Sequence, residues 1–67
     1  MQVGIVEWFD EKKGYGSILT MNKESVFVHF AAIIDSSYRM LQKGDKVKFV
    51  VVEGMNGPQA VRVQRLN

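Results

Sequence analysis

Apolar and polar residues alternate in several short segments of this chain, and residues that favour turns separate the segments. Alternation at every second position is typical of β-strands with one buried face. The pattern predicts five strands, at residues 3–9, 14–20, 26–30, 46–54 and 59–66. Turns are expected where charged, polar, glycine or proline residues gather, at 10–14, 21–25 and 54–58.

One predicted connection is much longer than the others. Residues 31–45 are too many and too irregular for a tight hairpin, although 31–34 favour one helical turn. Long loops within compact domains are often functional. Because a closed barrel leaves no exposed sheet edges, we expect the five strands to form a single all-β barrel domain over residues 1–67.

Alternation also assigns side chains to the two faces of the sheet. In the second strand, Tyr15 and Ser17 face away from Ile18. The residues expected in the core are Ile18, Val26, Val28, Val47, Phe49, Val51, Val61 and Val63. The outer face is expected to carry Tyr15, Phe27 and His29, with Trp8 from the first strand and with Lys12 and Lys13 at its edge.

The composition limits the classes of protein to consider. A chain of 67 residues has room for one small core, and the absence of cysteine excludes disulfides and thiolate metal sites. No apolar stretch approaches the roughly 20 residues that a membrane span needs, so we expect a soluble, unprocessed, cytoplasmic protein. The net charge of +2 permits a polyanionic partner, but it is also typical of an ordinary solvated surface.

An outward cluster of aromatic rings edged by lysines matches what single-stranded nucleic acid requires. Bases stack on such rings, at about 1–3 kcal/mol per base, and cations follow the phosphates. Gly14 and Gly16 are interpreted as clearance that lets a base lie flat on Tyr15, and as positions where the strand coils tightly. Aromatic residues on strands are nevertheless more often core. For Phe9 and Phe30, which lie at strand ends, alternation does not decide between a role in the core and a role in binding.

The residue types and motifs of this sequence give little support to a catalytic or metal-binding function. His29 is the sole histidine, and without cysteine or a second histidine we expect no metal site and no cofactor. Stacking on a base, or hydrogen bonding to one, suits His29 better. The segment 14–19 lacks the third glycine of a dinucleotide motif, and no Gly-Lys-Ser/Thr phosphate loop exists. We therefore expect a protein that is not an enzyme.

Several segments, in the right order, resemble the bacterial cold-shock proteins. "KGYGSI" and "VFVHF" are similar to the family's paired ribonucleoprotein motifs, Lys-Gly-Phe-Gly-Phe-Ile and Val-Phe-Val-His-Phe. "GIVEWFD" resembles the family's opening Gly-Lys-Val-Lys-Trp-Phe-Asn, and "HFAAI" resembles His-Phe-Ser-Ala-Ile. "LQKGDKVKF" and "EGMNGPQAVRV" resemble later family segments, so the likeness covers nearly the whole chain.

The resemblance implies an antiparallel, OB-type Greek-key barrel that binds single-stranded RNA or DNA with modest base preference, often towards pyrimidines. It implies a role as an RNA chaperone or as a regulator of transcription and translation. It also implies a binding face made of Trp8, Phe9, Lys13, Tyr15, Phe27, His29, Phe30 and Tyr38, the last of these in the long loop.

The chain departs from the family pattern at several positions. Ser17 stands where the family usually has a second exposed aromatic residue, and Glu7 stands where it usually has lysine. Asp10 replaces asparagine, Ser25 replaces aspartate, and Asn56 replaces a frequent basic residue. Losing one stacking platform costs about 1–3 kcal/mol, or roughly a factor of 5 to 150 in affinity. Glu7 and Asp10 are expected to repel phosphates.

Two functions therefore stay open. The first is a cold-shock-type single-strand-binding protein with weakened or altered base preference. The second is a protein-interaction module that keeps the barrel and has largely lost nucleic acid binding, as the residues Ser17, Glu7 and Asp10 suggest. We expect no membrane or small-molecule partner. We expect a monomer, with the alternative of a dimer in which two chains exchange their last two strands about residues 31–45.

Overall fold

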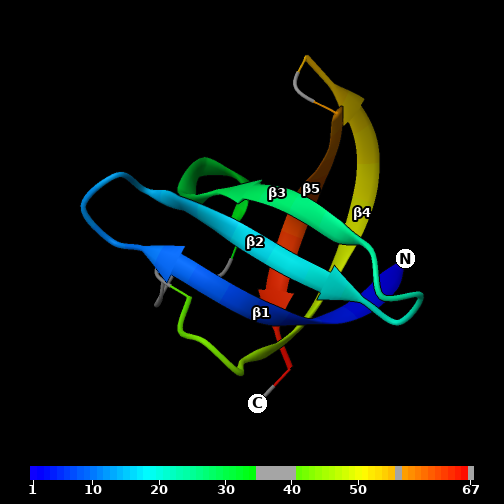
Figure 1. Cartoon of the computed structure of the whole chain (residues 1–67), viewed down its shortest axis with the longest axis horizontal. Coiled ribbons are helices and arrows are strands. Elements are labelled where there is room, and N and C mark those ends of the chain that lie inside the picture. Colours follow the sequence, from blue (N-terminus) through cyan, green and yellow to red (C-terminus); the bar gives the residue numbers. More distant parts are fainter. Residues whose placement is uncertain (35–40, 56, 67) are drawn as a thin grey trace.

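The computed structural model describes residues 1–34, 41–55 and 57–66, and these form five strands and one short 3₁₀ helix (Figure 1). The elements are β1 (Gln2–Asp10), β2 (Tyr15–Thr20), β3 (Ser25–His29), η1 (Phe30–Ala32), β4 (Lys46–Gly54) and β5 (Gly57–Arg65). Each predicted strand is confirmed to within two residues at either end. No helix among the described residues is long and apolar enough to cross a membrane.

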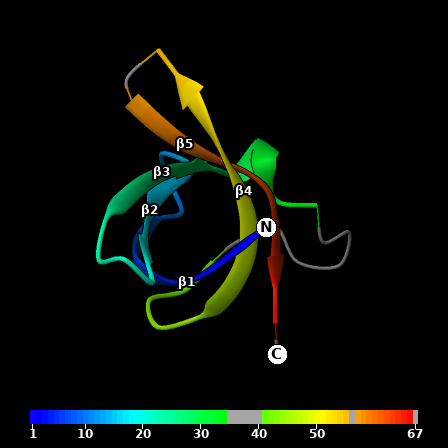
Figure 2. The same cartoon turned by 90° about the vertical axis from the view of Figure 1, so that its right-hand side faces the viewer.

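The strands close into a barrel in the order β1-β2-β3-β5-β4, which confirms the predicted architecture. Neighbouring strands are antiparallel except β3 and β5, which pair in parallel over two positions. This short pair closes the barrel. Figure 2 shows the barrel turned by 90°, with the end of β4 and the beginning of β5 extending away from it.

The core fills the barrel with aliphatic side chains around one buried ring, that of Phe49. The buried apolar residues are Val6, Ile18, Val26, Val28, Ile33, Leu41, Val47, Phe49, Ala60 and Val63. Six of the eight predicted core residues are among them, and Val51 is half-buried against this cluster. Val61 was predicted wrongly, because Ala60 is buried in its place.

The backbone of β5 explains why Val61 leaves the core. Arg62 has a positive φ of 53°, a conformation that interrupts the regular alternation of a strand. Ala60 and Val63, three positions apart, therefore both point inward. A strand that alternated throughout would have placed Val61 and Val63 on the same side.

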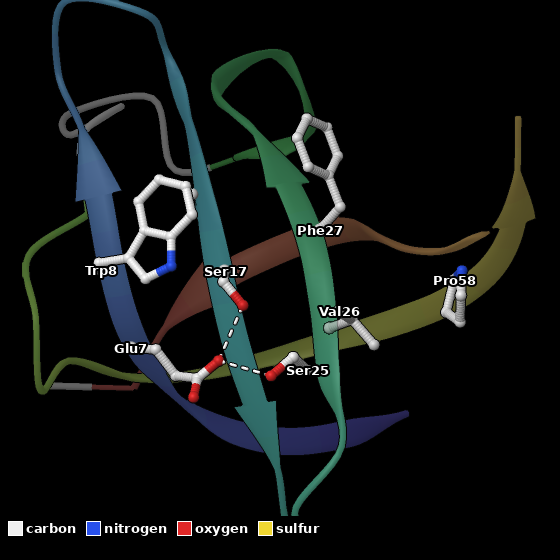
Figure 3. Close-up of a pocket in the computed structure, with 8 residues that line it drawn as sticks. Glu7, Trp8, Ser17, Ser25, Val26, Phe27 and Pro58 are labelled. Carbon is white, nitrogen blue, oxygen red and sulfur yellow. Dashed lines mark hydrogen bonds between the residues drawn. The ribbon is translucent and has the colours of Figure 1, made fainter. Parts of the chain in front are cut away.

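The pairing of β1 with β2 contains a β-bulge at Glu7. Val6 pairs with Ile18 and Trp8 pairs with Ser17, so that Glu7 is an extra residue on β1. A bulge of this kind redirects the side chains that follow it. Val6 stays in the core, while Glu7 and Trp8 both lie on the outer side of the sheet (Figure 3).

Both glycines beside Tyr15 meet the protein's own atoms, which corrects the expectation that they provide clearance for a base. A Cβ at Gly16 would lie 2.8 Å from the Cα of Phe9 and would overlap the carbonyl oxygen of Trp8. A Cβ at Gly14, where φ is +77°, would lie 2.8 Å from the ring of Phe30. The glycines are needed because strands and rings approach each other closely there.

Asp10 organises the turn between β1 and β2. Its Oδ1 accepts hydrogen bonds from the backbone N–H groups of Lys12 (2.9 Å) and Lys13 (3.0 Å). Its carbonyl oxygen accepts from the N–H of Gly14 at 2.8 Å. Asp10 was expected to act as a source of repulsion towards phosphates, and the structure gives it a local structural role in addition.

We expect Asp10→Ala to lower the free energy of unfolding by about 1 kcal/mol, since it removes the acceptor of two backbone hydrogen bonds at an exposed turn. Asp10→Asn keeps a carbonyl oxygen at the same place and should cost less. Urea denaturation of the two variants checks this. Equal losses in both would show that charge, rather than the acceptor, stabilises the turn.

Candidate nucleic-acid interface

Three aromatic side chains come together on the outer side of β1, β2 and β3. Trp8 pairs with Ser17, and Ser17 pairs with Phe27, so these residues form one row across the three strands. Tyr15 lies in the next row on the same face, opposite Asp10 and His29. The face assignment made from alternation is confirmed for Tyr15 and Phe27, and the expectation that Trp8 joins them is also confirmed. We call these three residues the ring surface.

The rings contact one another while staying open to solvent. The centroids of Trp8 and Tyr15 are 6.0 Å apart with an interplanar angle of 74°, and those of Tyr15 and Phe27 are 5.5 Å apart at 35°. Trp8 is 47% exposed, Phe27 is 38% exposed, and Tyr15 is half-buried between them. Neighbouring rings limit each other's rotation, so flat apolar faces are presented to solvent with little freedom left to lose on binding.

His29 and Phe30 extend this surface at the end of β3. Their ring centroids are 4.6 Å apart, and Phe30 is 43% exposed. Alternation left Phe30 undecided, and the structure places it outside the core, against Gly14. The Nδ1 atom of His29 accepts a hydrogen bond from the N–H of Ala31 at 3.2 Å, which caps η1 and orients the imidazole.

The other predicted binding residues are placed differently. Phe9 pairs with Gly16 on the inner side of β1, where it is half-buried and packs against the core. Phe9 does not belong to the ring surface. Trp8, just after the bulge at Glu7, points outward, so the next side chain, that of Phe9, points inward. Lys13 is exposed in the turn after β1, as expected. Tyr38 lies outside the described residues.

Glu7, Ser17 and Ser25 form a hydrogen-bonded group on the outer face, which we call the Glu7 cluster (Figure 3). The Oε1 atom of Glu7 accepts from Ser17 Oγ and from Ser25 Oγ, each at 2.8 Å. The sequence showed these residues as three separate departures from the family pattern. Two hydrogen bonds to one oxygen join them. The signal in the sequence was that all three departures fall within the first three predicted strands and the turn between the second and third.

The Glu7 cluster forms part of an open groove of about 560 Å³ beside the ring surface. The residues that line the groove are Glu7, Trp8, Gly16, Ser17, Ser25, Val26, Phe27 and Pro58. Figure 3 shows Ser17 between the side chains of Trp8 and Phe27, on the middle of the three strands. The groove therefore occupies the place where a larger side chain at position 17 would lie.

Positive charge lies around this face rather than within the groove. Lys12 and Lys13 are exposed at one end of the β1–β2 hairpin. On the other side of β1, Lys46 and Lys48 of β4 pair with Ile5 and Val3. The phosphates of a nucleic acid that lies across β1, β2 and β3 would meet these lysines at both margins of the face and the Glu7 carboxylate between them.

Comparison with known proteins gives matches over nearly the whole chain. The family model of the 'Cold-shock' DNA-binding domain matches residues 2–66. The major cold shock protein of Streptococcus pyogenes serotype M6 is 48% identical over 66 residues, covering 98% of each chain. The cold shock-like protein CspLB of Listeria monocytogenes serovar 1/2a is 46% identical over 66 residues, covering 98% of this chain and 100% of that protein.

The fold is also similar to that of a solved chain described as "drosophila Unr CSD456". The TM-score is 0.81 at 25% identity, and the match covers 98% of this chain and 26% of the solved one. This similarity agrees with the closed barrel and confirms its OB-type architecture. Because the family model spans residues 2–66 and the bacterial relatives are nearly half identical, this chain belongs to the cold-shock domain family.

Proposed function

We propose that this protein binds single-stranded RNA or DNA on the ring surface and acts as an RNA chaperone or as a regulator of transcription and translation. The observation that supports this most is the contact between the exposed rings of Trp8 and Phe27 and the ring of Tyr15 on adjacent strands. Bases stack on such rings irrespective of sequence, and lysines at the margins attract phosphates.

The roles of the individual residues follow from their positions. Trp8, Tyr15 and Phe27 would stack on successive bases, and His29 and Phe30 would extend the same path. Lys13 would contact a phosphate at the end of the β1–β2 hairpin. Glu7 would keep phosphates away from the groove, so base preference would differ from that of relatives with lysine there. We propose that the protein acts as a monomer.

We expect short single strands to quench the fluorescence of Trp8, the only tryptophan of the chain, at low salt. Replacing Phe27 with alanine should weaken binding by about 5- to 150-fold, because it removes one stacking platform worth about 1–3 kcal/mol. Titrations with RNA and DNA strands of several compositions check both statements.

Met21→Ala provides a matched control, since Met21 is an exposed apolar residue on the turn between β2 and β3. This variant should bind like the parent protein. If neither RNA nor DNA quenches Trp8 at low salt and micromolar strand concentration, the proposal is wrong, and the protein-interaction module becomes the better hypothesis.

A further inference from the structure

We propose that the groove between Trp8 and Phe27 selects cytosine over uracil and thymine through the carboxylate of Glu7. This inference rests on the proposed function and goes beyond it by naming the base that one site prefers. Uracil and thymine have a carbonyl oxygen at position 4 of the ring, whereas cytosine has an amino group there. At position 3 uracil and thymine carry an N–H flanked by two carbonyl oxygens, whereas cytosine has an acceptor nitrogen. A carboxylate placed beside position 4 therefore meets a donor in cytosine and an acceptor in uracil or thymine.

The groove has the shape for a stacked base. Trp8 and Phe27 stand on either side of Ser17, and the small serine side chain leaves the space between them open (Figure 3). A base entering there would contact an aromatic ring and bring its hydrogen-bonding edge towards the floor of the groove. Its volume of about 560 Å³ lies within the range of roughly 300–1,000 Å³ common for ligand pockets.

The floor of the groove presents acceptors. A serine hydroxyl has a single hydrogen, and Ser17 and Ser25 both direct theirs to Oε1 of Glu7. Their oxygens therefore offer only lone pairs to a ligand. An ionised carboxylate accepts and does not donate, so the Glu7 cluster as a whole favours a ligand that supplies N–H groups.

The two serines also hold the carboxylate in place. With Oε1 fixed by two hydrogen bonds from two different strands, the rotation of the Glu7 side chain is restricted. A preorganised acceptor loses little entropy when it binds an amino group, and a fixed negative charge repels a carbonyl oxygen that cannot avoid it. The structure therefore supplies both an attraction towards cytosine and a repulsion against uracil or thymine.

Trp8 contributes a donor that does not discriminate. Trp8 is one of the residues that line the groove, and its indole N–H can donate to a ring carbonyl. All three pyrimidines carry a carbonyl oxygen at position 2. The difference at position 4 is therefore left to Glu7. One charge-assisted hydrogen bond at a solvent-open site is expected to change affinity about tenfold.

The test compares strands that differ only in this group. Short deoxycytidine and thymidine homopolymers, and cytidine and uridine homopolymers, are titrated against Trp8 fluorescence at slightly alkaline pH, where cytosine is unprotonated. The parent protein should bind the cytosine strands about tenfold more tightly with either sugar. In Glu7→Gln, the amide oxygen can keep both serine bonds while the amide N–H₂ faces the groove, so the preference should vanish or reverse.

Glu24→Gln is the matched control, because it removes the same charge from an exposed residue outside the groove and should leave the ratio unchanged. Circular dichroism of each variant verifies the fold. Equal affinities for cytosine and uracil strands in the parent protein, or a preference that Glu7→Gln does not alter, would overturn this inference while leaving the proposed function intact. Failure of all strands to bind would overturn both.

Discussion

Replacing Gly16 with alanine is expected to lower the free energy of unfolding by about 3 kcal/mol or more. The new methyl group would overlap the carbonyl oxygen of Trp8 and lie 2.8 Å from the Cα and from a ring carbon of Phe9. Two of these three contacts are backbone atoms that cannot rotate away, so β1 and β2 would have to separate. Proteins of this length have a total stability of about 3–10 kcal/mol, at roughly 0.05–0.15 kcal/mol per residue.

Gly44→Ala gives a useful comparison in the same denaturation experiment. Gly44 has φ of +93°, but a methyl group there would meet no atom within 4 Å. Its replacement should cost only the conformational term, about 1–2 kcal/mol. If Gly16→Ala is as stable as the parent protein and only binds oligonucleotides more weakly, then Gly16 serves the ligand and the packing explanation given above is incorrect.

Ser17→Phe is expected to tighten binding of single strands by about 5- to 150-fold, the equivalent of one additional stacked base. Ser17 lies between Trp8 and Phe27 in the row across β1, β2 and β3, so a ring at this position would extend the ring surface without interruption. The substitution also removes one of the two hydrogen bonds to Glu7, a smaller loss at a half-buried site. Fluorescence titration at fixed low salt measures the net effect.

Ser17→Ala separates the two contributions, because it removes the hydroxyl without adding a ring. It should not tighten binding. If Ser17→Phe binds with the affinity of the parent protein, the bound nucleic acid does not cross the sheet at Ser17. The phenylalanine side chain should also fill the groove, so the cytosine preference inferred above should decrease in this variant even as overall affinity rises.

The Glu7 cluster changes how substitutions at these positions should be interpreted. Ser17 and Ser25 both donate to the same oxygen of Glu7, so the effects of replacing any two of the three residues are not expected to add. Replacing Glu7 alone would leave two serine hydroxyls to find new partners. The residues at positions 7, 17 and 25 are therefore best varied together as well as singly.

Much of the fold and of the ring surface could be predicted from the sequence. Side chains along a strand point alternately to its two faces. In β2, Tyr15 and Ser17 lie on the face opposite to Ile18, and in β3, Phe27 lies on the face opposite to Val28. That local rule was enough to place the rings of Tyr15 and Phe27 outside the core. The family motifs, spread over nearly the whole chain, indicated the OB-type Greek-key barrel and the kind of ligand to expect.

The tertiary structure alone decided the features that depend on how strands pair. The bulge at Glu7 turns two successive side chains outward, and the positive φ of Arg62 buries Ala60 instead of Val61. Neither irregularity leaves a mark in the alternation of its own strand. The hydrogen bonds from Ser17 and Ser25 to Glu7 join residues of three strands, and no pattern along one segment can show a contact that exists only after these strands have paired.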